Sequence, residues 1–179
     1  RCFDQIFHDV ALQNLPIVFC VVRAGFVGGD GPTHHGMLDI GYFRMMPGIA
    51  VIAPSDEAEL NKALRFALNH DKPTAVRYPR EPVLAIGHEG PDYELGKCRV
   101  IRQSTGSKVV LVACGAMTAR AMKAAAILAD EGIEVDVIDA RFAKPIDPAI
   151  IDMCFSKTVI TIEDHSLTTG FGSALLEEA

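Results

Sequence analysis

The chain has 179 residues, of which 49% are hydrophobic and 22% charged, as is typical of a globular protein with one large or two small cores. Its net charge of −6 argues against nucleic-acid binding, because nucleic-acid phosphates are bound by basic surfaces. All apolar runs are shorter than the roughly 18 residues that cross a membrane, and the five widely spaced cysteines favour free thiols over a disulfide framework.

Helix and strand patterns alternate in the first half of the chain. Residues 2–12 carry apolar positions at helical spacing, and the apolar run 16–22 is typical of a buried strand that leads into a glycine-rich loop. The predicted helices are 2–12, 38–44 and 55–69, the last with Ser55 as N-cap and Leu60, Ala63, Leu64, Ala67 and Leu68 as its buried stripe. The predicted strands are 16–22, 49–53 and 74–77.

The second half repeats this alternation after a stretch rich in proline and glycine. Residues 83–97 have no clear period and are predicted to be a linker. The predicted strands are 109–113, 134–139 and 158–162. The predicted helices are 119–130, one that starts at Pro148 with Asp147 as its cap, and one that follows Gly170 to Ser173. This pattern predicts an α/β fold with two three-layer α/β/α domains and mainly parallel sheets, over 1–82 and 98–179.

Two arginines follow predicted strands of the first half. Arg23 comes directly after the strand 16–22, and Arg80 follows the strand 74–77. Because parallel strands end at the same edge of a sheet, we expect the two guanidinium groups to converge. A guanidinium matches phosphate oxygens in pairs, so two of them form a phosphate clamp. The alternative is an ordinary ion pair between Arg23 and a nearby carboxylate.

The loop after Arg23 also carries an acid and two histidines. His34 follows Asp30 by four residues, and a carboxylate beside an imidazole fixes its tautomer and raises its basicity, which suits proton transfer near neutral pH. The alternatives are a surface hydrogen bond of His34, or a metal site that includes His35. Gly29-Asp30-Gly31 looks like the start of the magnesium–diphosphate motif of thiamine enzymes, but the paired asparagines that close it are missing, so we predict no metal site here.

Three polar residues, Glu163, Asp164 and His165, end the strand 158–162. Their position is compatible with a functional site, a subunit contact or a helix cap.

Several of these residues belong to motifs that resemble one enzyme family, the 1-deoxy-D-xylulose-5-phosphate synthases, which use thiamine diphosphate and are related to transketolase. The matching motifs begin at Arg1 (RCFDQ), Arg23 (RAGFVGGDGPTH), Pro54 (PSD), Arg77 (RYPR), Arg141 (RFAKP) and Gly170 (GFGS). The resemblance implies that 1–82 is part of a pyrimidine-binding domain, 83–97 a linker, and 98–179 part of a transketolase C-terminal domain. The chain departs from the family pattern at Phe3, Val22 and Glu81, and the extra charge of Glu81 lies close to Arg80.

The resemblance also implies an activity and roles for the candidate residues. The family joins pyruvate to D-glyceraldehyde 3-phosphate with loss of carbon dioxide, in the synthesis of isoprenoid and thiamine precursors. Arg23 and Arg80 would bind the phosphate of the aldehyde. Asp30 and His34 would contact its hydroxyl and carbonyl and assist proton transfer, and Arg1 would lie near the group derived from pyruvate.

The chain begins without methionine inside a predicted helix and stops after another helix begins, so we expect a piece of a longer protein. The resemblance implies thiamine diphosphate and Mg²⁺ as cofactors of the full-length enzyme, bound by residues upstream of Arg1. We therefore expect this fragment alone to be inactive and not to bind the cofactor. The full-length enzyme would be a homodimer without nucleic-acid or membrane partners, in the bacterial cytoplasm or a plastid-type organelle. The alternatives are another transketolase-like enzyme, the β subunit of a 2-oxo acid dehydrogenase, or a non-catalytic α/β assembly module.

Overall fold

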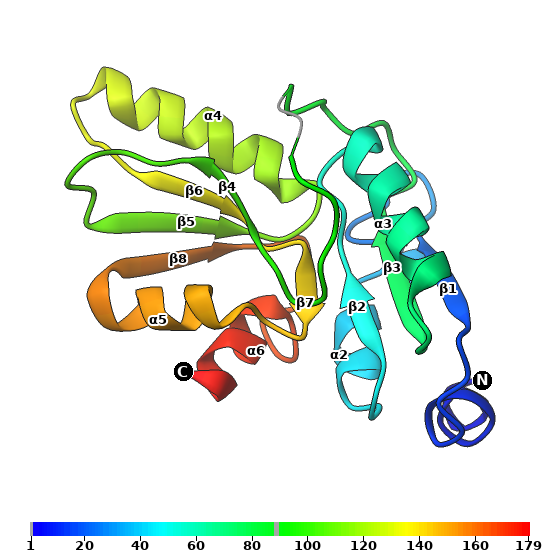
Figure 1. The fold of residues 1–179 in the computed structure, drawn as a ribbon. Coiled ribbons are helices and arrows are strands. Elements are labelled where there is room, and N and C mark those ends of the chain that lie inside the picture. Colours follow the sequence, from blue (N-terminus) through cyan, green and yellow to red (C-terminus); the bar gives the residue numbers. More distant parts are fainter. Residues whose placement is uncertain (1, 88–89) are drawn as a thin grey trace.

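The structure, a computed structural model, describes residues 2–87 and 90–179, which form two four-stranded sheets side by side (Figure 1). The order in the first sheet is β1 (Val18–Val22), β3 (Thr74–Tyr78), β2 (Ala50–Ile52) and β7 (Phe142–Lys144). The order in the second is β4 (Arg99–Arg102), β6 (Asp136–Asp139), β5 (Val109–Ala113) and β8 (Thr158–Ile162). In each sheet three strands are parallel and one edge strand, β7 or β4, is antiparallel.

Helices pack on both sheets. Those of the first half are α1 (Phe3–Gln5), which continues as the π-helix η1 (Ile6–Ala11), the 3-10 turn η2 (Pro32–His34), α2 (Asp39–Arg44) and α3 (Glu57–Asn69). Those of the second half are α4 (Met117–Asp130), α5 (Pro148–Ser156) and α6 (Phe171–Glu178). Figure 1 shows α4 above the second sheet and α5 below it, which is the predicted layered arrangement. None of the helices among the described residues is long and apolar enough to span a bilayer.

The central strand β5 shows how its sequence builds this core. Leu111 and Ala113 point toward α4, where they pack with Ala121 and Ala125. The alternate residues Val110 and Val112 point to the opposite face and belong to a core that also contains residues of the first half. Because successive side chains of a strand point to opposite faces, a continuous apolar run buries both faces of the sheet.

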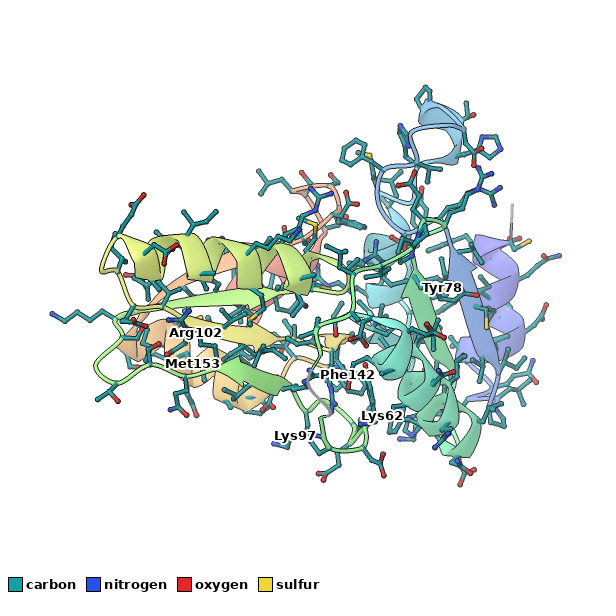
Figure 2. All side chains as sticks on the ribbon, turned by 90° about the horizontal axis from the view of Figure 1, so that it is seen from above. Lys62, Tyr78, Lys97, Arg102, Phe142 and Met153 are labelled. Carbon is teal, nitrogen blue, oxygen red and sulfur yellow. The ribbon has the colours of Figure 1, made fainter. Side chains whose placement is uncertain are left out.

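The two halves are joined by β7. This short strand follows the second-half strand β6 in sequence but pairs with β2, so that Phe142 lies opposite Ile52. Figure 2 places Phe142 between the two halves. Neither β4 nor β7 was predicted from the sequence, because each is short and mixed in polarity, and each pairs with a strand that is distant in sequence. The prediction of mainly parallel sheets is nevertheless correct.

Two local predictions for α3 were wrong. Asp56, not Ser55, is the N-cap, because its carboxylate accepts a hydrogen bond of 2.9 Å from the Glu59 N–H. The hydroxyl of Ser55 instead donates to the buried carboxylate of Asp139, 2.6 Å away. The buried stripe of this helix is also narrower than predicted, since Leu68 is 76% exposed.

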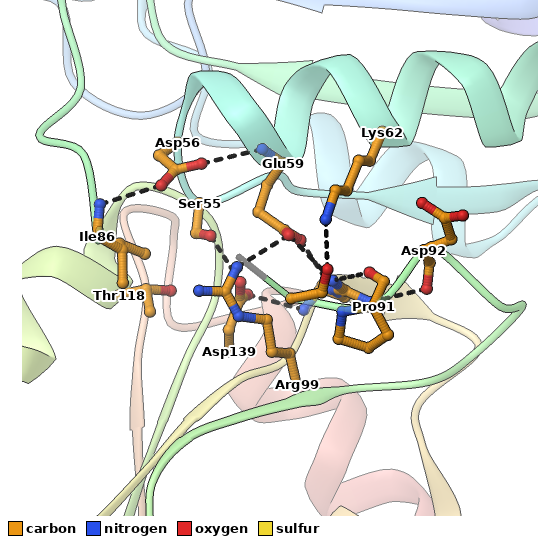
Figure 3. A network of polar contacts seen from close by, with 12 residues as sticks. Ser55, Asp56, Glu59, Lys62, Ile86, Pro91, Asp92, Arg99, Thr118 and Asp139 are labelled. Carbon is orange, nitrogen blue, oxygen red and sulfur yellow. Dashed lines mark hydrogen bonds and ion pairs between the residues drawn. The ribbon is translucent and has the colours of Figure 1, made fainter. Parts of the chain in front are cut away.

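A buried ion cluster fastens α3 to the second half of the chain (Figure 3). The carboxylate of Glu59 accepts hydrogen bonds of 2.8 and 3.0 Å from Arg141 and lies 2.9 Å from a guanidinium nitrogen of Arg99. Arg141 also donates to the carbonyls of Pro91 and Asp92, in the segment predicted to be a linker. The segment also contacts the first half, where the Ile86 N–H donates to the Asp56 carboxylate across 3.0 Å. No helix or strand forms in its described parts, 83–87 and 90–97.

Candidate anion-binding site

The glycine-rich loop, residues 24–36, leaves the first sheet at the carboxyl end of β1. In Figure 2 this pale blue loop projects from the body of the molecule. Val22 pairs with Tyr78 at the ends of the parallel strands β1 and β3, and the Ala24 N–H donates to the Tyr78 carbonyl across 3.1 Å. Arg23 and Arg80 consequently leave neighbouring strands at the same edge of the sheet.

The two guanidinium groups converge on Asp30. The Nε of Arg23 donates to Oδ2 of Asp30 at 2.7 Å, and a terminal nitrogen of Arg80 donates to Oδ1 at 2.6 Å. The predicted convergence is thus confirmed, and so is the alternative that Arg23 forms an ion pair with a nearby carboxylate. The role of these arginines as a phosphate clamp stays a prediction.

The charge balance of this cluster favours a further anion. Hydrogen bonds from Arg23 and then Arg80 lower the pKa of the Asp30 carboxyl, which therefore stays ionised at neutral pH. Two guanidinium groups and one carboxylate carry a net charge of +1. Because a guanidinium has about five N–H donors and each arginine uses one nitrogen on Asp30, most donors can bind a second anion.

The predicted pair of Asp30 and His34 was wrong. Both carboxylate oxygens of Asp30 are taken up by the arginines, and Nδ1 of His34 instead lies 2.9 Å from the Thr33 hydroxyl. The spacing of four residues between Asp30 and His34 did not bring them into contact, because Arg80 binds Asp30 from a neighbouring strand. The His34 imidazole is exposed, so it is free to meet a ligand.

His35, considered above as a possible metal ligand, contacts residues of its own loop. Its Nδ1 accepts a hydrogen bond of 3.0 Å from the Val27 N–H, and its ring lies 5.3 Å from that of Phe26. Within residues 2–87 and 90–179, no group of three or more His, Cys, Asp or Glu side chains is arranged to hold a metal ion. Asp30 in particular faces two positive groups, which would repel a cation.

A cavity of about 190 Å³ adjoins this cluster. It lies between the two halves, and its lining includes Phe26, Arg80, Glu81, Arg120 and Asp164. Glu81, which departs from the family pattern, therefore lines the same hollow as Arg80. Arg1, the remaining predicted substrate-binding residue, lies outside the described residues.

A buried polar group, which was not predicted from the sequence, lies beneath the loop. Arg77 donates through Nε to Oδ2 of Asp39 at 2.8 Å, and Nε2 of His165 lies 3.4 Å from the other oxygen of Asp39. Burial by itself would raise the pKa of Asp39, but the nearby His165 ring and the charge of Arg77 outweigh it and lower the pKa. The available signal was Arg77 itself, because a charged residue inside a buried strand needs a partner.

The acidic residues after β8 have two different roles. Glu163 accepts hydrogen bonds of 2.7 and 2.8 Å from the backbone N–H groups of Phe171 and Gly172, so it caps α6. Asp164 reaches the other half of the chain and accepts from the Phe26 N–H. The helix-cap alternative is thus confirmed for Glu163.

Two family models match almost the whole chain. Residues 1–84 match the transketolase pyrimidine-binding domain, and residues 96–179 match the transketolase C-terminal domain. The chain belongs to the transketolase family. This membership confirms the predicted α/β fold class and the predicted relation to transketolase-type enzymes.

Curated relatives support the more specific resemblance. The chain is 46% identical over 181 residues to 1-deoxy-D-xylulose-5-phosphate synthase 2 of Geobacter sulfurreducens. It is 48% identical over 182 residues to the 1-deoxy-D-xylulose-5-phosphate synthase of Carboxydothermus hydrogenoformans. Each match covers 99% of this chain but 29% of the relative, so the chain spans less than a third of these relatives' length.

Solved structures agree with the fold. A structure described as "Split gene transketolase, inactive beta4 tetramer" superposes with a TM-score of 0.89 at 30% identity, over 99% of this chain and 57% of that one. The transketolase of Campylobacter jejuni superposes with a TM-score of 0.74 at 26% identity, over 88% of this chain and 26% of that one.

Proposed function

We propose that this chain is part of an enzyme that condenses pyruvate with D-glyceraldehyde 3-phosphate to form 1-deoxy-D-xylulose 5-phosphate and carbon dioxide. The observation that supports this proposal is the convergence of Arg23 and Arg80 at the carboxyl edge of the first sheet. The names of the curated relatives point to the same reaction. The product would serve isoprenoid and thiamine synthesis, in the bacterial cytoplasm or in a plastid-type organelle.

We assign the phosphate of the aldehyde to the two arginines. Both side chains are about half exposed, with 42% and 52% of their surface open to solvent, so a ligand can reach them. Asp30 holds the guanidinium groups at a common position before the phosphate arrives, which reduces the cost of ordering them on binding. Arg23 and Arg80 then donate their remaining N–H groups to the phosphate oxygens.

Proton transfer falls to His34 in this proposal. An imidazole exchanges protons near neutral pH, and His34 is exposed on the same loop as Asp30. Asp30 is a poor proton donor there because its pKa is lowered, so we assign it to orienting the arginines and accepting a substrate hydroxyl. We keep Arg1 as a further contact to the group derived from pyruvate.

Thiamine diphosphate, when bound, supplies the electron sink that lets pyruvate lose carbon dioxide. The described residues do not fit its magnesium–diphosphate part, because the carboxylate of Gly29-Asp30-Gly31 is engaged by two arginines. We therefore propose that residues outside this chain's described part hold both cofactors. We further propose that this chain alone is inactive and does not bind the cofactor, and that the active enzyme is a homodimer.

The test is Arg23→Gln in an active form of the enzyme. Loss of a charged phosphate contact costs about 1.5–3 kcal/mol, so KM for D-glyceraldehyde 3-phosphate should rise about ten- to one-hundred-fold while KM for pyruvate changes less than about twofold. Arg65→Gln is the matched control, because Arg65 is exposed on α3 and lines a different cavity. Equal effects of Arg23→Gln on both substrates would contradict the assignment.

A further inference from the structure

The glycine-rich loop is closed at a narrow neck. The Gly25 N–H donates to the Gly36 carbonyl at 3.0 Å, and the Gly36 N–H donates back to the Gly25 carbonyl at 2.9 Å. These paired bonds define the base of the segment that carries Asp30 and His34. Any group that holds the neck therefore constrains the two ends of that segment.

Asp164, from the second half of the chain, holds one side of this neck. Its carboxylate accepts from the Phe26 N–H, with both oxygens 3.3–3.4 Å from that nitrogen. The approach is close enough that a Cβ added to Gly25 would lie 2.0 Å from Oδ2 of Asp164. Gly25 also has a φ of +82°, so the backbone at this position is suited to glycine and leaves room for that carboxylate.

Arg77 ties the other side of the neck to the same segment. Its terminal nitrogen lies 3.4 Å from the Gly36 carbonyl and 3.5 Å from the Asp164 carbonyl, and its Nε is fixed on Asp39. The Arg77 side chain is buried, so this arrangement is shielded from solvent. A single guanidinium thus bridges the neck of the loop and the segment that follows β8.

Two further contacts fasten this segment next to the neck. His165 has a fully buried side chain that faces Asp39, and the Ser166 N–H donates to the Met37 carbonyl at 3.2 Å. The segment 164–166 therefore contacts the first half at Met37 and at Asp39, the first residue of α2. Glu163, one residue earlier, bonds to α6 instead and takes no part in the neck.

We propose that Asp164 is a positioning residue, through which the second half of the chain fixes the orientation of the glycine-rich loop and so of the Arg23–Asp30–Arg80 cluster. If the proposed function holds, the affinity for the phosphorylated aldehyde depends on the Asp164 carboxylate, which acts through the neck. This consequence therefore rests on the proposed function. Asp164→Ala removes the acceptor of the Phe26 N–H, whereas Asp164→Asn keeps one acceptor oxygen of similar shape.

The experiment compares Asp164→Ala, Asp164→Asn and the control Glu163→Gln in the active enzyme. We expect Asp164→Ala to raise KM for D-glyceraldehyde 3-phosphate by about fivefold or more, with KM for pyruvate and for unphosphorylated glyceraldehyde within about twofold of wild type. Asp164→Asn should restore most of the affinity. Glu163→Gln should show no selectivity for the phosphorylated substrate.

Hydrogen exchange in the same variants gives a second readout that does not depend on turnover. Asp164→Ala should speed exchange of the Phe26 amide and of the loop while leaving the amides of β5 and β8 unchanged. Unchanged loop exchange, or a KM shift equal for all substrates, overturns the proposal. If Arg23→Gln also leaves every KM unchanged, the proposed function fails. In that case the hydrogen-exchange result alone tests whether Asp164 positions the loop.

Discussion

Replacing Glu59 by Gln removes the carboxylate that lies between two buried arginines. The side chain of Glu59 is 1% exposed, and those of Arg141 and Arg99 are 1% and 4% exposed. Glu59 comes from α3, whereas both arginines come from the second half of the chain. The variant therefore leaves two buried positive charges without this counter-charge at the contact between the halves.

The expected loss of stability is about 3–5 kcal/mol, because removing one partner of a buried ion pair leaves the other charge uncompensated. Glutamine keeps the volume and one acceptor oxygen, but its amide N–H₂ group faces a guanidinium that can only donate. Arg141 retains its bonds to the carbonyls of Pro91 and Asp92, which limits the loss. Since a domain is stable by about 5–15 kcal/mol, this change is a large fraction of the total.

Urea unfolding followed by circular dichroism at pH 7 measures this difference. Glu57→Gln is the matched control, since Glu57 is exposed in the first turn of the same helix and its charge contributes at most about 1 kcal/mol there. A Glu59→Gln variant within about 1 kcal/mol of the wild type would refute the role given to the buried cluster.

Two further predictions concern Asp139 and the neck of the loop. Burial is the main cause that raises the pKa of Asp139 to about 6 from 3.8, so the folded chain binds more protons than the unfolded chain between these values, and stability falls as pH rises through about 6. Asp139→Asn should therefore flatten the pH dependence of urea unfolding between pH 4 and 6 and stabilise the chain at pH 7.5 by up to about 3 kcal/mol; an unchanged slope would count against this. Gly25→Ala should cost at least about 1–2 kcal/mol, from its positive φ and its contact with Asp164, whereas Gly28, with open space around it, should tolerate alanine; equal melting temperatures of the two variants would contradict the geometry of the neck.

Local sequence patterns predicted helices and strands well where the formation of the element depends on residues close in sequence. The strands 109–113 and 158–162 have the predicted bounds. For 109–113 the reason is that a buried parallel strand is a continuous apolar run. Asp147 caps α5 as predicted, with Pro148 in the first turn. The convergence of Arg23 and Arg80 followed from topology alone, since parallel strands end at one edge.

The remaining features depend on partners that are distant in sequence. Ser55 fits the rules for an N-cap, but its hydroxyl is taken by Asp139, 84 residues away, and Asp56 caps the helix instead. Asp30 is four residues from His34, yet Arg80 reaches it from 50 residues away. Residue spacing could not predict either contact, because both depend on how the strands and the two halves are placed.

The most direct test of the phosphate clamp is a titration of this chain with inorganic phosphate, followed by the amide NMR signals of the glycine-rich loop. We expect saturable shifts in the wild type, an affinity at least about tenfold weaker in both Arg23→Gln and Arg80→Gln, and an unchanged affinity in Arg65→Gln. Equal affinities in all four proteins would contradict the assignment of Arg23 and Arg80 as the anion-binding pair.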